Sequence, residues 1–139
     1  MKLKIGFFTF EFEILLIIIF FSSIFSVIIR DMMYSFYMCY LFIIFHEMSH
    51  MLVASIYGKE IKAFKFYLSG VSIVIDDKIR LKKFKEILIY LAGPVSNIIL
   101  CIMFKENKFI YEINMGLALI NLFPIFPLDG YNILLTIIN

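Results

Sequence analysis

The sequence is poor in charged residues and carries almost no net charge. Asp, Glu, Lys and Arg make up 17% of its 139 residues, whereas ordinary soluble domains contain about 25%. This shortage excludes an intrinsically disordered chain, a coiled coil and most soluble enzymes. The 13 basic and 11 acidic residues leave a net charge of +2. Nothing in this balance indicates a nucleic-acid partner.

Cysteine is scarce as well. The two cysteines, Cys39 and Cys101, lie inside long apolar stretches and show no spacing pattern. They do not form a disulfide framework, and we interpret them as small buried hydrophobic residues. Internal repeats and low-complexity linkers are not visible in the sequence, so its length fits one domain.

Apolar side chains, by contrast, are in excess. They make up 63% of the chain, and the mean hydropathy is +0.97. A core of this size cannot hide so many Ile, Leu and Phe residues from water. We therefore expect the protein to be surrounded by lipid.

Four apolar segments are candidate transmembrane helices, at residues 14–29, 32–57, 87–104 and 109–128. The first is slightly shorter than the ~20 residues that a bilayer requires. It follows Lys2 and Lys4 but lacks a small-residue cleavage site, so we interpret it as a retained span rather than a signal peptide. Pro124 and Pro127 interrupt the last segment. The sequence predicts a mainly α, polytopic membrane protein whose single membrane-embedded domain covers residues 1–139.

The remaining segments show the alternation that is typical of strands. Phenylalanines occupy every second position over residues 8–12, which favours a strand within residues 3–13. Residues 61–76 contain two short β-type runs separated by Ser69 and Gly70, which indicates a hairpin. These pieces predict a small β-sheet at the membrane surface.

Basic residues are distributed unevenly around the apolar segments. Residues 59–85 contain eight of them, and the first four residues contain two more. The segments that would face the other side of the membrane contain only Arg30, Lys105 and Lys108. Because basic residues accumulate on the cytoplasmic side, we expect a multi-pass protein of the cell membrane with both termini in the cytoplasm.

The second apolar segment contains both histidines of the chain, in the motif His46-Glu47-Met48-Ser49-His50. On a helix, residues i and i+4 lie on one face, so both imidazoles can bind one Zn²⁺ while Glu47 stands beside it. Glu47 could then act as a general base toward an attacking water. Ionisable residues within a membrane span are costly and indicate function. The alternative is a histidine pair that only forms interhelical hydrogen bonds.

A catalytic zinc also requires a third protein ligand and an open coordination position. Three glutamates outside the motif are less suitable candidates, at the opposite membrane face or in the N-terminal strand: Glu112, Glu11 and Glu13. Asp129 is better placed, because it ends a run in which two prolines break the helix at the membrane side where His50 lies. The alternative is that Pro-Leu-Asp-Gly forms only an interfacial turn.

Three blocks of the sequence, residues 46–50, 92–97 and 121–130, resemble the motifs of the site-2 protease family of intramembrane zinc metalloproteases. The compact layout, without an inserted PDZ domain, is most similar to a bacterial subgroup. That subgroup includes the sporulation protease that processes a membrane-associated sigma-factor precursor. High usage of Ile, Lys, Phe and Asn also points to an AT-rich bacterial genome.

The resemblance implies one Zn²⁺ per chain with three protein ligands, His46, His50 and Asp129. It implies that Glu47 is the catalytic base. It also implies that Asn97 and Asn121 lie near the site, where their amides could hold a substrate strand. For Asn97, an interhelical hydrogen bond is the alternative.

The sequence thus predicts a zinc metalloendopeptidase that hydrolyses a peptide bond in or near the transmembrane segment of a membrane-anchored protein. The predicted strands offer an edge on which an unwound substrate could pair. Two alternatives remain open: a non-catalytic zinc-binding adaptor or degenerate protease, and a metal transporter. Only nine residues follow Gly130. We therefore expect either a minimal core or a homo-oligomer or partner membrane protein that completes the site.

Overall fold

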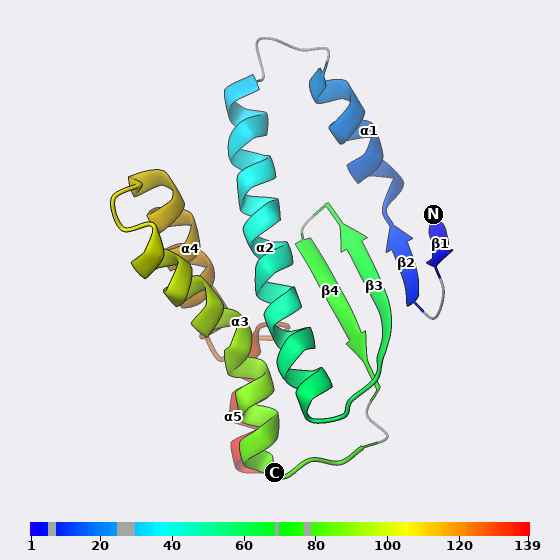
Figure 1. Ribbon diagram of the computed structural model, residues 1–139, viewed down its shortest axis with the longest axis vertical. Coiled ribbons are helices and arrows are strands. Elements are labelled where there is room, and N and C mark those ends of the chain that lie inside the picture. Colours follow the sequence, from blue (N-terminus) through cyan, green and yellow to red (C-terminus); the bar gives the residue numbers. More distant parts are fainter. Residues whose placement is uncertain (6–7, 25–29, 69, 77–78) are drawn as a thin grey trace.

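The computed structural model describes residues 1–5, 8–24, 30–68, 70–76 and 79–139. In chain order its elements are β1 (Lys2–Ile5), β2 (Phe8–Phe12), α1 (Ile14–Ile24), α2 (Arg30–Ile56), β3 (Ile61–Tyr67), β4 (Gly70–Ile75), α3 (Lys83–Met103), α4 (Lys108–Asn121) and α5 (Asp129–Ile138). Helix α2 lies between the sheet on one side and α3, α4 and α5 on the other (Figure 1).

The strands form one mixed sheet in the order β1-β2-β3-β4. The strand predicted from the alternating residues 8–12 is confirmed as β2, but residues 2–5 form a separate strand, β1, antiparallel to it. The hairpin predicted within 61–76 is confirmed, although Ser69 of its predicted turn lies outside the described residues. The sequence did not predict that β2 pairs in parallel with β3, with Phe10 opposite Phe64. A parallel pair needs a long crossover, which α1 and α2 supply here.

Two helices among the described residues are long and apolar enough to cross a membrane, within Met32–Ile56 and Lys83–Met103. They have 25 and 21 residues, and at ~1.5 Å per residue each exceeds the ~30 Å of a hydrocarbon core. Their positions agree with the predicted segments 32–57 and 87–104.

The other two predicted spans form shorter helices. Helix α1 has 11 residues, and residues 25–29 of its predicted span lie outside the described residues. Helix α4 has 14 residues and ends at Asn121 rather than at residue 128. Pro124 and Pro127 explain the early end, since proline cannot donate the hydrogen bonds of a continuing helix. The structure therefore does not show four complete spans.

Several polar side chains are buried while many large apolar ones are exposed. Among the described residues, the buried polar or charged ones are His46, His50, Asp76, Asn97 and Asn114. Large apolar side chains on α2 and α3 are exposed instead, such as Ile56 at 70% and Ile102 at 68%. An apolar surface around a polar interior fits the lipid environment that the composition indicates.

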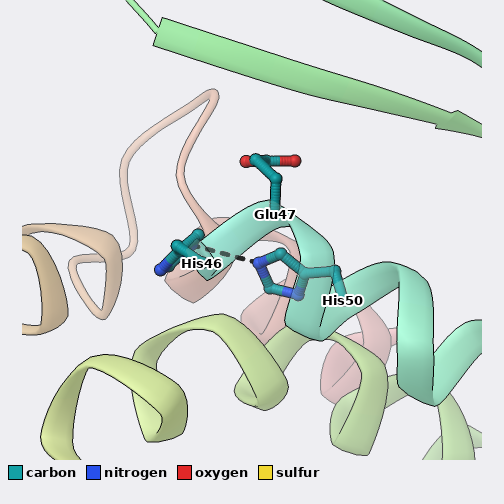
Figure 2. A group of neighbouring side chains, drawn as sticks. All are labelled: His46, Glu47 and His50. Atoms are coloured by element: carbon teal, nitrogen blue, oxygen red, sulfur yellow. Dashed lines mark hydrogen bonds between the residues drawn. The ribbon is translucent and has the colours of Figure 1, made fainter. Parts of the chain in front are cut away.

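The hairpin of β3 and β4 is attached to the side of α2. The Tyr40 hydroxyl donates to the carbonyl oxygens of Tyr67 and Gly70, at 2.9 and 3.2 Å. Tyr40 lies near the middle of α2, so the hairpin extends along the C-terminal half of this helix. Strand β4 consequently runs past the turn of α2 that contains the two histidines (Figure 2).

Candidate metal centre

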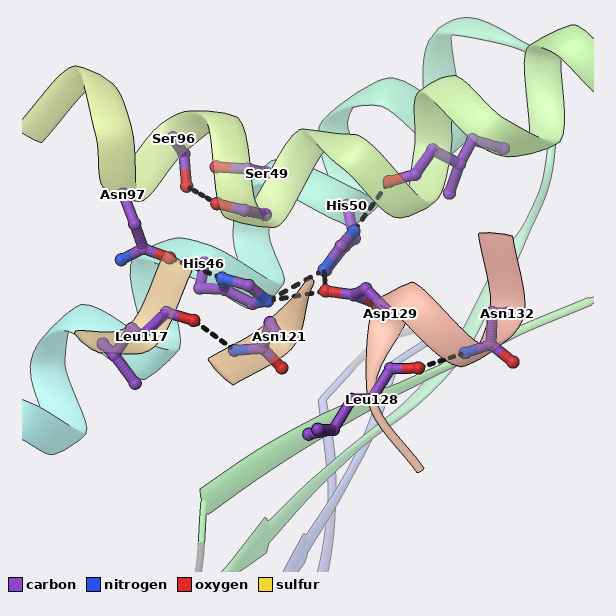
Figure 3. Close-up of polar contacts among 12 residues, drawn as sticks. His46, Ser49, His50, Ser96, Asn97, Leu117, Asn121, Leu128, Asp129 and Asn132 are labelled. Carbon is purple, nitrogen blue, oxygen red and sulfur yellow. Dashed lines mark hydrogen bonds and ion pairs between the residues drawn. The ribbon is translucent and has the colours of Figure 1, made fainter. Parts of the chain in front are cut away.

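Three side chains from two distant parts of the chain converge beside α3. His46 and His50 lie one turn apart on α2, and their Nε2 atoms are 3.1 Å from each other. Asp129, in the first turn of α5, places Oδ2 3.0 Å from Nε2 of His46 and 3.2 Å from Nε2 of His50 (Figure 3). Both histidines are buried, with 4% and 7% of their surface exposed.

The outer nitrogen of each imidazole faces an oxygen acceptor. Nδ1 of His50 donates to the main-chain carbonyl of Ile89 at 2.7 Å. Nδ1 of His46 donates to Oδ1 of Asn97 at 2.5 Å. A neutral imidazole has a single N–H, so when Nδ1 donates, Nε2 presents a lone pair. Both Nε2 lone pairs therefore point toward Asp129 and toward each other.

This arrangement fits a divalent metal ion. With the imidazoles neutral, two nitrogens and one carboxylate oxygen meet at about 3 Å with no donor hydrogen among them. A cation between these atoms replaces their mutual repulsion by attraction. Tetrahedral Zn²⁺ holds nitrogen and oxygen ligands at about 2.0–2.1 Å, which places them roughly 3.3 Å apart. The donor set and its spacing therefore suit zinc, with hydrogen-bonded outer nitrogens of the kind that metal-binding histidines show.

Glu47 stands beside these three side chains rather than among them. Its carboxylate lies within 4.8 Å of the donor atoms of both histidines, but the side chain points toward the strands of the sheet (Figure 2). It lines a cavity of about 180 Å³ together with His50, Asp129 and residues of β4. Ile73 of β4 lines the same cavity. Glu47 is thus positioned to act on a molecule in the cavity.

Two glycines allow the backbones to approach the site. A Cβ atom at Gly93 of α3 would overlap the Nε2 atoms of His46 and His50. A Cβ atom at Gly130 would overlap the backbone carbonyls of Leu122 and Phe123, against which the start of α5 packs. Gly93 therefore lets α3 cover the imidazoles, and Gly130 lets the first turn of α5 bring Asp129 to them.

The remaining candidates from the sequence lie in different surroundings. Asn97 is fully buried next to His46, whereas Asn121 donates from Nδ2 to the carbonyl of Leu117 in its own helix. The glutamates outside the motif are engaged elsewhere. Glu112 pairs with Lys108, Glu11 pairs with Lys2, and Glu13 accepts from the backbone N–H of Leu68.

Sequence reasoning missed one buried polar residue near the centre. Asn114 of α4 has no exposed surface, and its Oδ1 accepts a hydrogen bond from Nδ2 of Asn97 at 2.8 Å. Its position within an apolar stretch was a usable signal, because polar side chains inside membrane segments are costly. Both cysteines are free, as expected; Cys101 is buried as predicted, whereas Cys39 is only partly buried.

Replacing Asp129 by alanine is expected to weaken Zn²⁺ binding by more than about 100-fold. Loss of an outer-shell partner of a metal ligand costs about 10- to 100-fold, and removal of a ligand should cost more. The affinity is measured by competition with a chromophoric chelator, and Glu112→Ala, which alters an exposed carboxylate on α4, serves as the control. An unchanged affinity in Asp129→Ala would reject Asp129 as a metal ligand.

Both the sequence and the fold are similar to those of known proteins. A family model described as Peptidase M50B-like matches residues 13–125. Among solved structures, the chain is similar to the site-2 protease from Methanocaldococcus jannaschii, with a TM-score of 0.68 and 26% sequence identity. That similarity covers 99% of this chain and 71% of the other. No curated protein sequence matches significantly.

Proposed function

The chain belongs to the peptidase M50B-like family, and from this premise we propose that it is an intramembrane zinc metalloprotease. It hydrolyses a peptide bond in or near the transmembrane segment of a membrane-anchored protein. The observation that carries this proposal is the convergence of His46, His50 and Asp129 beside the carboxylate of Glu47. A metal site with an adjacent acid-base group at a cavity is the arrangement that metal-assisted hydrolysis requires.

Each residue has a separate role in the reaction. His46, His50 and Asp129 would hold the metal, with Nε2 of each histidine and Oδ2 of the aspartate as the donor atoms. A bound Zn²⁺ supplies Lewis acidity, which polarises the substrate carbonyl and acidifies a water molecule. Glu47 removes a proton from the attacking water and later delivers it to the nitrogen of the leaving amine. The peptide bond and one water molecule are replaced by a carboxylic acid and an amine, and Glu47 returns to its initial state.

The substrate must be extended when it reaches this site, because a helix hides its carbonyl groups in its own hydrogen bonds. Strand β4 supports this view, since its pairing in the described sheet is with β3 alone and several of its residues line the cavity of Glu47. An unwound segment that pairs with the edge of β4 would enter this cavity. Asn121 is proposed to contact the substrate, and Asn97 is better explained by its bond to His46.

We further propose that residues 1–139 form one domain in the cell membrane, with both termini in the cytoplasm. The basic residues of segment 59–85 support this orientation. The short segments 14–29 and 109–128 would then complete the membrane part, through local thinning of the bilayer or contacts with a second copy or a partner protein. Membership of the bacterial sporulation subgroup remains a prediction.

Removal of the metal is expected to abolish cleavage. The purified protein is reconstituted in liposomes with a panel of single-span model substrates that carry a fluorescent tag. Treatment with 1,10-phenanthroline should stop the release of tagged fragments, and Zn²⁺ but not Mg²⁺ should restore it. Cleavage that persists in the metal-free protein would contradict the proposal, whereas metal binding without any cleavage would favour the non-catalytic adaptor.

A further inference from the structure

A chain of buried side-chain amides leads from His46 to the backbone of α4. Nδ1 of His46 bonds to Oδ1 of Asn97, and Nδ2 of Asn97 donates to Oδ1 of Asn114. Nδ2 of Asn114 then donates to the main-chain carbonyl of Ile110 at 2.9 Å. Both asparagines have 0% exposed surface. The chain therefore connects α2, α3 and α4 through two fully buried asparagines.

The end of this chain determines the orientation of every group in it. A main-chain carbonyl can only accept, so Asn114 must direct its NH₂ group toward Ile110 and its oxygen toward Asn97. Asn97 must then direct its own NH₂ group toward Asn114 and its oxygen toward His46. This oxygen requires an N–H at Nδ1 of His46, which leaves the lone pair on Nε2.

The two histidines differ in what fixes the position of their N–H proton. His50 donates directly to the carbonyl of Ile89, and the polarity of a backbone carbonyl cannot be reversed. His46 instead faces a side-chain amide, which would present either its oxygen or its nitrogen if it were free to rotate by half a turn. The partner amide of Asn114 removes that freedom.

We propose that Asn114 is a positioning residue for the metal centre. Its side chain hydrogen-bonds to Asn97 and Ile110 rather than to a metal-binding side chain, and it acts by fixing the orientation of Asn97 and hence the tautomer of His46. This inference rests on the proposed metal site but not on proteolysis. Without Asn114, Asn97 can turn its NH₂ group toward Nδ1, which then accepts, and the proton moves to Nε2, where it blocks the metal.

The test compares two nearly isosteric variants. Asn114→Leu removes both hydrogen bonds, whereas Asn114→Asp keeps an oxygen that accepts from Asn97, whether its carboxyl group is protonated or ionised. We expect Asn114→Leu to bind Zn²⁺ about 10- to 100-fold more weakly than wild type, in the range for loss of an outer-shell partner. Asn114→Asp should bind with an affinity close to wild type.

A matched control separates positioning from stability. Asn107 caps the N-terminus of the same helix, where its side chain accepts from the backbone N–H of Ile110. Asn107→Leu should lower the melting temperature but leave Zn²⁺ affinity unchanged. In addition, ¹⁵N NMR of the metal-free protein should show His46 protonated at Nδ1 in wild type and Asn114→Asp, and a tautomer mixture in Asn114→Leu.

Each outcome is decisive. If wild type binds Zn²⁺ and Asn114→Leu binds it equally well, the positioning role is wrong. The role is also wrong if Asn114→Asp loses as much affinity as Asn114→Leu, since the loss then follows from disturbed packing. Failure of wild type itself to bind Zn²⁺ would overturn the proposed metal site, and the inference about Asn114 with it.

Discussion

Glu47→Gln is expected to lose peptide hydrolysis while it retains Zn²⁺. Glutamine has nearly the same shape as glutamate but cannot accept the proton of an attacking water. A positioned general base contributes about 10²- to 10⁴-fold to a rate, so fragment release should fall by at least the lower value. The metal should remain because the three groups that meet at about 3 Å are His46, His50 and Asp129. Metal content and fragment release are measured on the same preparation.

The control for this variant is Glu112→Gln, which makes the same chemical change at an exposed carboxylate paired with Lys108. It should cleave substrates at the wild-type rate. Cleavage by Glu47→Gln at the wild-type rate would remove Glu47 from the mechanism. Loss of Zn²⁺ in Glu47→Gln would instead identify Glu47 as a metal ligand. Its carboxylate lies within 4.8 Å of the donor atoms of both histidines, so the metal content of this variant tests that possibility.

Gly93→Ala is expected to abolish stoichiometric Zn²⁺ binding and, with it, cleavage. The added methyl group would overlap the Nε2 atoms of His46 and His50, the atoms that are proposed to bind the metal. The imidazoles cannot simply rotate away, because Asn97 and Ile89 hold their outer nitrogens. Overpacking of this kind typically costs about 1–3 kcal/mol in stability. Zinc content by mass spectrometry and the melting temperature of the metal-free protein measure both effects.

The chain offers a matched glycine for comparison. Gly116 lies in α4, and a Cβ atom there would meet nothing within 4 Å. Gly116→Ala should therefore retain Zn²⁺, and the stability should rise by about 0.5–1 kcal/mol, as is usual when alanine replaces glycine in a helix. If Gly93→Ala bound Zn²⁺ as tightly as Gly116→Ala, the close approach of α3 to the histidines would not be a requirement of the site.

Glu47→Gln and Gly93→Ala both act on a polar centre that is enclosed by apolar helices. The buried side chains near the metal site are hydrogen-bonded to one another, and the large apolar side chains face outward. A buried amide or imidazole without a partner is costly in such surroundings. Small changes at the centre are therefore expected to have large effects, whereas changes on the exposed carboxylates should have little.

The features that depend on nearby residues could be predicted from the sequence. Alternating phenylalanines predicted β2, the long apolar run predicted α2, and the spacing of His46 and His50 placed both imidazoles on one helix face. These features follow from periods of two and 3.6 residues, which the order of side chains displays directly. The end of α4 was misjudged because hydropathy continues to residue 128 while the helix stops before Pro124.

By itself, then, the sequence predicted a lipid environment, most of the helices and strands, and the local histidine pair with its glutamate. The sequence also proposed Asp129 as the third ligand, but only the tertiary structure brings it against the two histidines. Asp129 reaches His46 across 83 residues of chain, and Asn114 reaches Asn97 from another helix. The role of Gly93 depends on the close approach of α3 to the imidazoles of His46 and His50. Such contacts depend on how helices pack and how closely their backbones approach, and no local period in a sequence records those distances.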